Sequence, residues 1–268
     1  MVARGGVNSG MKSGVKSGAM ARLKTGRVLP VAVSLLVLVG LWQGAIALFD
    51  IPPFVLPGLG AILKHAVSEF KPLSASLGAT LLEASSGYVL GAFCGLLLAM
   101  LMVLVAPLER CLMPLCVAIN SVPIVAYTPL CLIWFGMGPA SKIVLIALAV
   151  GFTILVNALH GLKLPEEAAI NLMRSFGASP IGIMRRLRLP AAMPSVVSGL
   201  RVAVPRSMIV AIVGEMLGAY KGLGRVIYES TQQVNLLNVW AAVLFASLAS
   251  MLLYGLLVWV DRKLVWWR

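Results

Sequence analysis

Long apolar runs occupy most of this chain, and they constrain its fold more than any other feature. Six runs are present, at Val28 to Phe49 and at about 79–105, 111–136, 140–162, 192–217 and 237–260. Each is long enough to cross the hydrocarbon layer, which takes about 20 helical residues at about 1.5 Å per residue. Only 12% of the residues are charged, against about 25% in a soluble domain. The sequence therefore predicts an all-α membrane protein with six transmembrane helices.

The ends of the chain and the first loop are more polar. Residues 1–27 are rich in Gly, Ser and Lys and lack apolar periodicity, which predicts a disordered basic tail. Residues 28–54 then hold the first transmembrane helix and the start of an external loop. Ala45-Ile46-Ala47 resembles a signal-peptide cleavage site, but this run exceeds the usual apolar region of about 7–15 residues. We therefore expect a retained helix, followed by a loop with a short amphipathic helix from Gly60 to Phe70.

Lys and Arg are unevenly divided between the two sides of the predicted bundle. Fifteen fall on the side of both termini, in the tail, at Arg110, in the 163–188 loop and in the basic end 262–268. The opposite side holds Lys64, Lys71, Lys142, Lys221 and Arg225. Positive loops stay in the cytoplasm, so we expect both termini and the 163–188 loop there. Membrane topology thus explains the net charge of +13, and we expect no nucleic-acid partner.

The loop from Leu164 to Ser195 has helix signals at several places. Pro165 and the two following glutamates favour a helix start, and Gly177 favours its end. Ser179-Pro180 predicts the start of a second short helix, and Leu189-Pro190 predicts its end. The residues alone leave two interpretations open: a basic amphipathic segment that lies on anionic lipid, or a docking element for a cytoplasmic partner.

This loop resembles the signature of the permease subunits of ABC importers, the binding-protein-dependent inner-membrane component family. Gly177, Leu187 and Leu189-Pro190 have the family's spacing. The family's Glu-Ala-Ala begins six residues before the glycine, where this chain has Asn171-Leu172-Met173. The resemblance implies that the cytoplasmic segment 163–190 couples to an ATPase. Its expected contact residues are Glu167, Asn171, Arg174, Gly177, Ala178, Ser179, Leu187, Leu189 and Pro190.

Three further stretches extend the resemblance over roughly residues 55 to 260. They are 55–63, Pro123 to Ile146 and Val196 to Ile227, and they are similar to the branch that serves sulfonates, taurine, nitrate and thiamine precursors. The resemblance implies a MetI-like permease bundle over 55–261 in the cell inner membrane. It also implies a homodimer, two cytoplasmic ABC ATPase subunits and an extracytoplasmic solute-binding protein. ATP and Mg would be bound by the ATPase, so we expect no cofactor and no enzyme activity in this chain, which contains no GxxxxGK[ST] phosphate loop.

Polar residues inside the predicted spans are candidates for a solute pathway. An ionised group at mid-bilayer costs about 2.5–3.5 kcal/mol, so Arg206 and Glu215 in the fifth span should face protein or a water-filled cavity. They are too far apart to pair directly within one straight helix, and Arg206 suits an anionic solute. The alternative for each is a structural ion pair with another span. The prolines of the third span, Pro114, Pro123 and Pro129, predict that it is kinked or split. Asn120, Ser121 and Tyr127 lie beside them, where polar groups either line a pore or satisfy freed backbone groups.

Other functions have less support. The four cysteines and two histidines lack a zinc-ligand spacing, so no metal site is predicted. A secondary transporter driven by an ion gradient would need more embedded carboxylates than Glu83, Glu109 and Glu215 supply. The sequence therefore favours a permease subunit that moves a small anionic solute into the cytoplasm, driven by separate ATPase subunits.

Overall fold

The computed structural model describes the fold of residue 30 and residues 33–264. The predicted basic tail 1–27 therefore lies outside the described residues, as do residues 265–268 of the predicted cytoplasmic C-terminus. The chain divides into two compact units, Met1–Gly60 and Ala61–Arg268.

The described part of the first unit is dominated by one apolar helix, Val33–Leu48. Most of its side chains are exposed, including Leu36 and Leu41. The indole Nε1 of Trp42 donates a hydrogen bond to the Pro57 carbonyl oxygen at 3.3 Å, which ties the following loop back to this helix. These described residues cover the centre of the first predicted span, and by themselves they are fewer than a full crossing requires.

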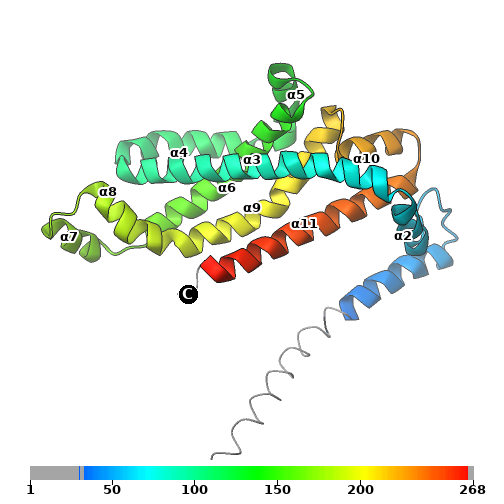
Figure 1. The fold of residues 1–268 in the computed structure, drawn as a ribbon, viewed down its shortest axis with the longest axis horizontal. Helices are drawn as coiled ribbons and strands as arrows, with labels where there is room; N and C mark the ends of the chain where they lie inside the picture. The colour runs from blue at the N-terminus through cyan, green and yellow to red at the C-terminus, as the bar shows by residue number, and fades with distance from the viewer. Residues whose placement is uncertain (1–29, 31–32, 265–268) are drawn as a thin grey trace, which may run out of the picture. The chain divides into compact units, whose positions relative to one another are not determined.

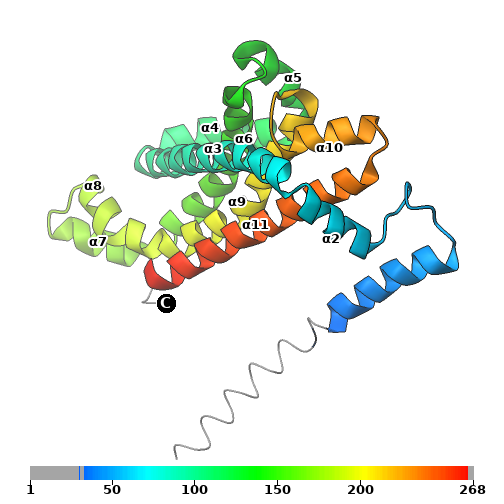
Figure 2. The same ribbon diagram turned by 45° about the vertical axis from the view of Figure 1, so that its right-hand side comes forward.

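Every regular element of the second unit, over its described residues, is helical (Figure 1). The helices are α2 (Leu59–Ser68), α3 (Phe70–Leu104), α4 (Ala106–Ser121), α5 (Ile124–Phe135), α6 (Pro139–Leu162), α7 (Glu167–Ser175), α8 (Pro180–Ile183), the π-helix η1 (Met184–Arg188), α9 (Leu189–Gly218), α10 (Leu223–Gln232) and α11 (Leu236–Leu264). The predicted short helix from Gly60 to Phe70 corresponds to α2. In both views α7 and α8 lie at one end of this unit and α10 lies at the other (Figures 1 and 2).

Four helical segments of the described chain are long and apolar enough to cross a membrane: Phe70–Leu104, Pro139–Leu162, Pro180–Gly218 and Leu236–Trp259. A fifth crossing is formed if α4 and α5, which meet at 96°, count as one broken span. The multi-pass helical architecture is therefore confirmed, whereas the count of six spans stays a prediction because part of the first predicted span lies outside the described residues.

The break between α4 and α5 confirms that the third predicted span is split. Pro123 has no N–H to donate, and a proline disfavours helical geometry in the residue before it. Val122 is accordingly extended, with φ −79° and ψ 132°. The freed Ile119 carbonyl oxygen accepts a hydrogen bond from the Tyr127 hydroxyl at 2.9 Å. This bond fixes the direction in which α5 leaves α4.

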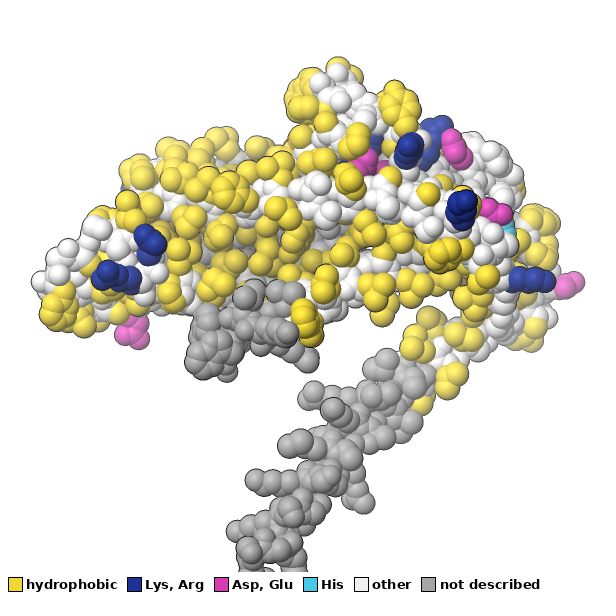
Figure 3. Space-filling model, in the orientation of Figure 1, with side chains coloured by type: hydrophobic (Ala, Val, Ile, Leu, Met, Phe, Trp, Pro, Cys, Tyr) yellow, Lys and Arg dark blue, Asp and Glu magenta, His cyan; other side chains and the backbone are white. Residues whose placement is uncertain are grey.

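Helices α3, α6 and α9 form the packed centre of the second unit. Gly87, Gly91 and Gly95 of α3 face α6 so closely that a Cβ atom at Gly91 would lie 2.6 Å from the Ala147 carbonyl oxygen. Small residues allow such close approach of membrane helices. Apolar side chains cover the middle of the face shown in Figure 3, whereas charged side chains gather towards its two ends. This distribution fits a protein whose middle is solvated by lipid.

The segment between α6 and α9 is more continuous than predicted. Helix α7 ends at Gly177 as expected: φ is +76° there, and the Ala178 and Gly177 amides donate to the Met173 and Arg174 carbonyl oxygens. The predicted end of the second helix at Leu189-Pro190 is wrong. The chain instead continues from α8 through η1 into α9, and the Leu189 amide donates to the Met184 carbonyl oxygen, five residues back. The wider π turn relieves the clash that a proline ring makes with the preceding turn of an α-helix.

Candidate functional site

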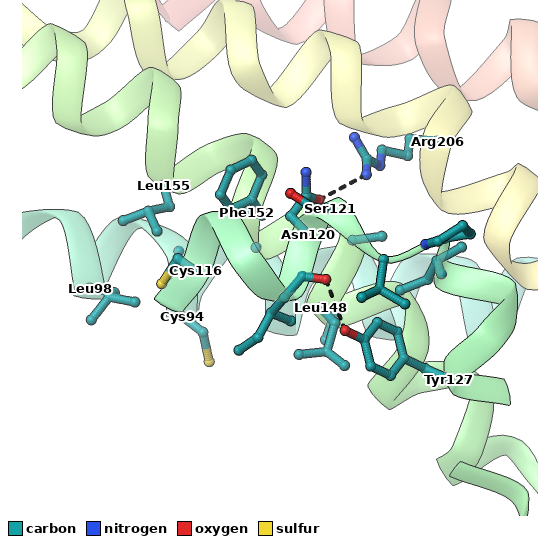
Figure 4. Close-up of a pocket in the computed structure, with 18 residues that line it drawn as sticks. Cys94, Leu98, Cys116, Asn120, Ser121, Tyr127, Leu148, Phe152, Leu155 and Arg206 are labelled. Carbon is teal, nitrogen blue, oxygen red and sulfur yellow. Dashed lines mark hydrogen bonds between the residues drawn. The ribbon is translucent and has the colours of Figure 1, made fainter. Parts of the chain in front are cut away.

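A cavity of about 370 Å³ lies beside the break between α4 and α5, with walls from α3, α4, α5 and α6 (Figure 4). Four of the five predicted pathway residues line it together. Asn120 and Ser121 come from the end of α4, Tyr127 comes from α5 and Arg206 comes from α9. The structure thus brings Arg206 of α9 beside Asn120 of α4, 86 residues earlier in the chain.

Hydrogen bonds fix the polar corner of this cavity. Arg206 Nη2 donates to the Asn120 side-chain oxygen at 3.2 Å, as the dashed line in Figure 4 shows. The Ser121 hydroxyl donates to the Val117 carbonyl oxygen at 2.8 Å, and the Tyr127 hydroxyl donates to Ile119 as described above. Ser121 and Tyr127 therefore satisfy backbone groups at the broken helix while they also line the cavity. The two interpretations offered for these residues are compatible.

The remaining walls are mostly apolar. They include Cys94, Leu98, Cys116, Leu148, Phe152 and Leu155. Arg206 is the one ionised side chain among the described residues that line the cavity. A guanidinium presents several N–H donors in a plane that matches carboxylate and similar oxyanions. The cavity therefore offers an anion-binding group at one corner and apolar surface elsewhere.

Glu215 does not line this cavity. It is fully buried near the C-terminal end of α9. There its Oε2 accepts hydrogen bonds from the Thr80 hydroxyl at 3.0 Å and from the Gly224 amide at 2.7 Å. Its assignment to the pathway stays a prediction. Glu83 of α3 and Lys142 of α6 lie in the same buried group and interact electrostatically with Glu215.

Sequence reasoning missed two members of this buried group. Lys142 was placed among the external residues, but its side chain is buried and Nζ donates to the Met137 and Gly138 carbonyl oxygens at 2.7 and 3.1 Å. Thr80 carried no signal, because a threonine within an apolar run is common. The place of Lys142 near the start of α6 carried no signal either, because the groups left free at a helix start are N–H donors, which favour acidic rather than basic side chains.

The predicted coupling residues lie on and between the short helices at the opposite end of the unit. Glu167 begins α7, and Arg174 donates to the Asn171 side-chain oxygen at 3.3 Å. Ser179 caps α8 by accepting from the Gly182 amide at 3.1 Å. Ala178 and Arg174 line a small cavity of about 200 Å³. Leu187 lies in η1, and Leu189 and Pro190 begin α9.

Several apolar side chains that were not predicted as contacts project from this segment, among them two on and just after α7. Leu172 on α7 is 59% exposed, and Phe176 at its end is 83% exposed. Large apolar side chains that gather on an exposed surface beside charged ones mark interaction sites. Their position on the helix that carries Asn171 and Arg174 supports the docking interpretation of the loop.

Comparison with known proteins agrees with the sequence pattern. Residues 87–266 match the family described as "Binding-protein-dependent transport system inner membrane component". A probable ABC transporter permease protein of Haemophilus influenzae is 32% identical over 86% of this chain and 94% of its own length. The formylaminopyrimidine transport permease protein ThiX of Halalkalibacterium halodurans is 34% identical over 81% of this chain and 87% of its own. The taurine transport system permease protein TauC of Escherichia coli is 28% identical over 88% of each chain.

A solved structure of the MetNI methionine ABC transporter, in inward-facing conformation, contains a chain with the same fold. It aligns with a TM-score of 0.59 and 21% identity over 72% of this chain and 94% of that one. The MetI-like fold class is confirmed, and so is the predicted resemblance to the importer branch. The ion-gradient alternative finds no support among these relatives. The chain is a multi-pass membrane permease of an ABC importer, and it belongs to the binding-protein-dependent transport system inner membrane component family.

Proposed function

We propose that this permease moves a small anionic solute into the cytoplasm, along a path that passes the cavity beside Arg206. The observation that carries this proposal is the cavity itself. Among the described residues that line it, Arg206 is the ionised one, and its guanidinium donates a hydrogen bond to Asn120. Relatives named for taurine and for formylaminopyrimidine support a small organic solute. Sulfonates, taurine, nitrate and thiamine precursors form the candidate set.

The proposed assembly contains two copies of this chain, two cytoplasmic ATPase subunits and an extracytoplasmic binding protein, within membrane lipid. ATP and Mg bind to the ATPase subunits, and this chain performs no hydrolysis of its own. The charge distribution supports an orientation with both termini and the 163–190 segment in the cytoplasm. The exposed Leu172 and Phe176 would then face the ATPase.

Coupling follows from the continuity of the chain after the cytoplasmic turn. The turn at Gly177 joins α7 to α8, and α8 continues through η1 into α9 without a break. The 30 residues of α9 form a rod roughly 45 Å long at about 1.5 Å per residue. Arg206 lies on this rod. A displacement of α7 and α8 by the ATPase is therefore carried to the side chain that contacts the solute.

The test is ATP-dependent uptake by the complex reconstituted in vesicles. Taurine, an alkanesulfonate, nitrate and an aminopyrimidine serve as the solute panel. Arg206→Gln removes the charge, and we expect it to lower uptake of the anionic solute about tenfold or more, because a charge-assisted hydrogen bond is worth about 1.5–3 kcal/mol. Arg206→Lys should retain part of the activity.

Arg110→Gln is the matched control, because it makes the same chemical change at an exposed arginine of α4 that does not line the cavity. It should leave uptake unchanged. Wild-type uptake by the Arg206→Gln complex would contradict the proposed path, and transport of uncharged solutes alone would contradict the proposed solute class.

A further inference from the structure

The buried polar group around Glu215 lies where three spans meet the first residues of α10. Thr80 of α3, Lys142 of α6 and Glu215 of α9 are all almost completely buried. Both views show α10 beside the adjoining end of α9 (Figures 1 and 2). None of these side chains lines the cavity beside Arg206, so the buried group requires a separate explanation.

Two side chains from different helices bind the first amides of α10. Glu215 Oε2 accepts from the Gly224 amide at 2.7 Å and from the Thr80 hydroxyl at 3.0 Å, and Thr80 Oγ1 accepts from the Leu223 amide at 2.9 Å. The first amides of a helix have no partners within the helix, and a negative charge near them is favourable. We call this set of bonds the Thr80–Glu215 latch.

The local sequence is suited to this contact. Gly222 has φ +115°, a conformation that favours glycine, and a Cβ atom there would collide with the Glu215 carboxylate. A Cβ atom at Gly224 would collide with the backbone of α9. Both glycines therefore let α10 sit directly on the Glu215 side chain.

Lys142 and Glu83 complete the electrostatic setting of the latch. Both side chains lie within electrostatic range of Glu215, and Lys142 Nζ donates to the carbonyl oxygens that precede α6. Buried ionisable groups within a membrane bundle are costly, and they mark functional positions more often than ordinary packing positions. One polar side chain is enough to cap the start of a helix. This buried group is therefore larger than the capping of α10 requires.

The position of the latch suggests what it does. Glu215 lies near one end of α9, and the other end of α9 continues into η1 and α8. Among the exposed residues of the segment that carries α10 are Lys221, Tyr228 and Glu229, a polar surface that fits a folded soluble protein. We propose that the Thr80–Glu215 latch makes α10 move with α9 as one body, so that docking of the extracytoplasmic binding protein on α10 is passed along α9 to the ATPase-coupling segment. This inference rests on the proposed function and orientation, and it makes Thr80 and Glu215 positioning residues.

The test measures ATP hydrolysis by the assembled complex in nanodiscs, with and without its binding protein. Thr80→Val keeps the shape of the side chain but removes both hydroxyl bonds. We expect ATP hydrolysis without the binding protein to stay within about twofold of wild type, while the stimulation by the binding protein falls at least about fivefold, the lower end of usual coupling effects. Thr80→Ser keeps the hydroxyl and should retain the stimulation.

Two further measurements separate coupling from folding. Hydrogen exchange of residues 222–226 should accelerate in Thr80→Val, because the Leu223 amide loses its partner. Thr153→Val is the matched control, since the Thr153 hydroxyl donates to the Ala149 carbonyl oxygen within α6 and takes no part in the latch. It should behave as wild type in both assays.

Several results would overturn the inference. Full stimulation in Thr80→Val despite accelerated exchange would show that the latch is not part of the coupling. A proportional loss of basal and stimulated hydrolysis would show a purely structural role. If Thr80→Val does not assemble, Glu215→Gln, which keeps one acceptor oxygen, is measured in the same way, and failure of both variants to assemble would equally assign the latch to folding alone. Lack of stimulation in the wild-type complex would instead contradict the proposed function.

Discussion

Gly91 provides a direct test of how closely α3 and α6 approach each other. Gly78 and Gly91 are both interior residues of α3, but only Gly91 faces a neighbouring helix. A Cβ atom at Gly91 would lie 2.6 Å from the Ala147 carbonyl oxygen and 2.9 Å from its Cα, whereas nothing lies within 4 Å of a Cβ atom at Gly78. The colliding atoms belong to the backbone of α6, so they cannot rotate away as a side chain would.

The expected magnitudes follow from two opposing effects. Replacing glycine by alanine inside a helix gains about 0.8–1.0 kcal/mol of helix propensity. Overpacking a tight contact costs about 1–3 kcal/mol. Gly78→Ala should therefore raise the free energy of unfolding by roughly 1 kcal/mol. Gly91→Ala should combine both effects, so that its stability lies about 1–3 kcal/mol below that of Gly78→Ala.

The assay compares the two variants in detergent micelles, by denaturant titration followed by circular dichroism. Gly78→Ala is the matched control because it makes the same chemical change in the same helix. Equal free energies of unfolding for the two variants would refute the reasoning, because the collision with Ala147 would then have no energetic cost. Retention of uptake in Gly78→Ala would show that the change in α3 itself is tolerated.

Three further predictions concern the half of the permease that contains α7 and α8. Gly177→Pro should abolish ATP-dependent uptake with membrane insertion intact, because proline cannot adopt φ +76°; normal uptake would argue against the turn. Reversing the charges of Arg185 and Arg186 to glutamate should reduce co-purification of the ATPase, and unchanged recovery would argue against this face as the contact. Arg201→Met should destabilise the fold by about 3–5 kcal/mol in denaturant titration, because it leaves buried Asp261 without its partner. Adding Asp261→Leu should restore much of that loss, and no recovery in the double variant would contradict the pairing.

The features that could be predicted from the sequence are those set by local composition. Apolar runs of sufficient length predict the crossings, and Pro123 predicts the break in the third one, because proline acts on its own turn and the residue before it. Gly177 predicts the end of α7 for the same reason, since a positive φ is a local requirement. The polar cluster at that break was also found, because Asn120 and Tyr127 stand close to the prolines.

The features that could not be predicted depend on contacts between distant segments. The latch joins Thr80 to Glu215, 135 residues apart, and no periodicity indicates such a pair. Leu189-Pro190 predicts a helix end, because proline usually disrupts a helix, but the π turn in η1 supplies room that the residue pattern does not reveal. Lys142 was counted as external because a lysine near the start of an apolar run usually reaches water.

The charge of Arg206 also bears on what the permease keeps out. Every opening of a route through the bilayer risks short-circuiting the proton and sodium gradients on which the cell depends. A fixed guanidinium beside the route repels hydronium and metal cations while it attracts an oxyanion. If the solute passes Arg206 as proposed, the same group that attracts the cargo also limits ion leakage, and Arg206→Gln should make an active importer electrically leaky.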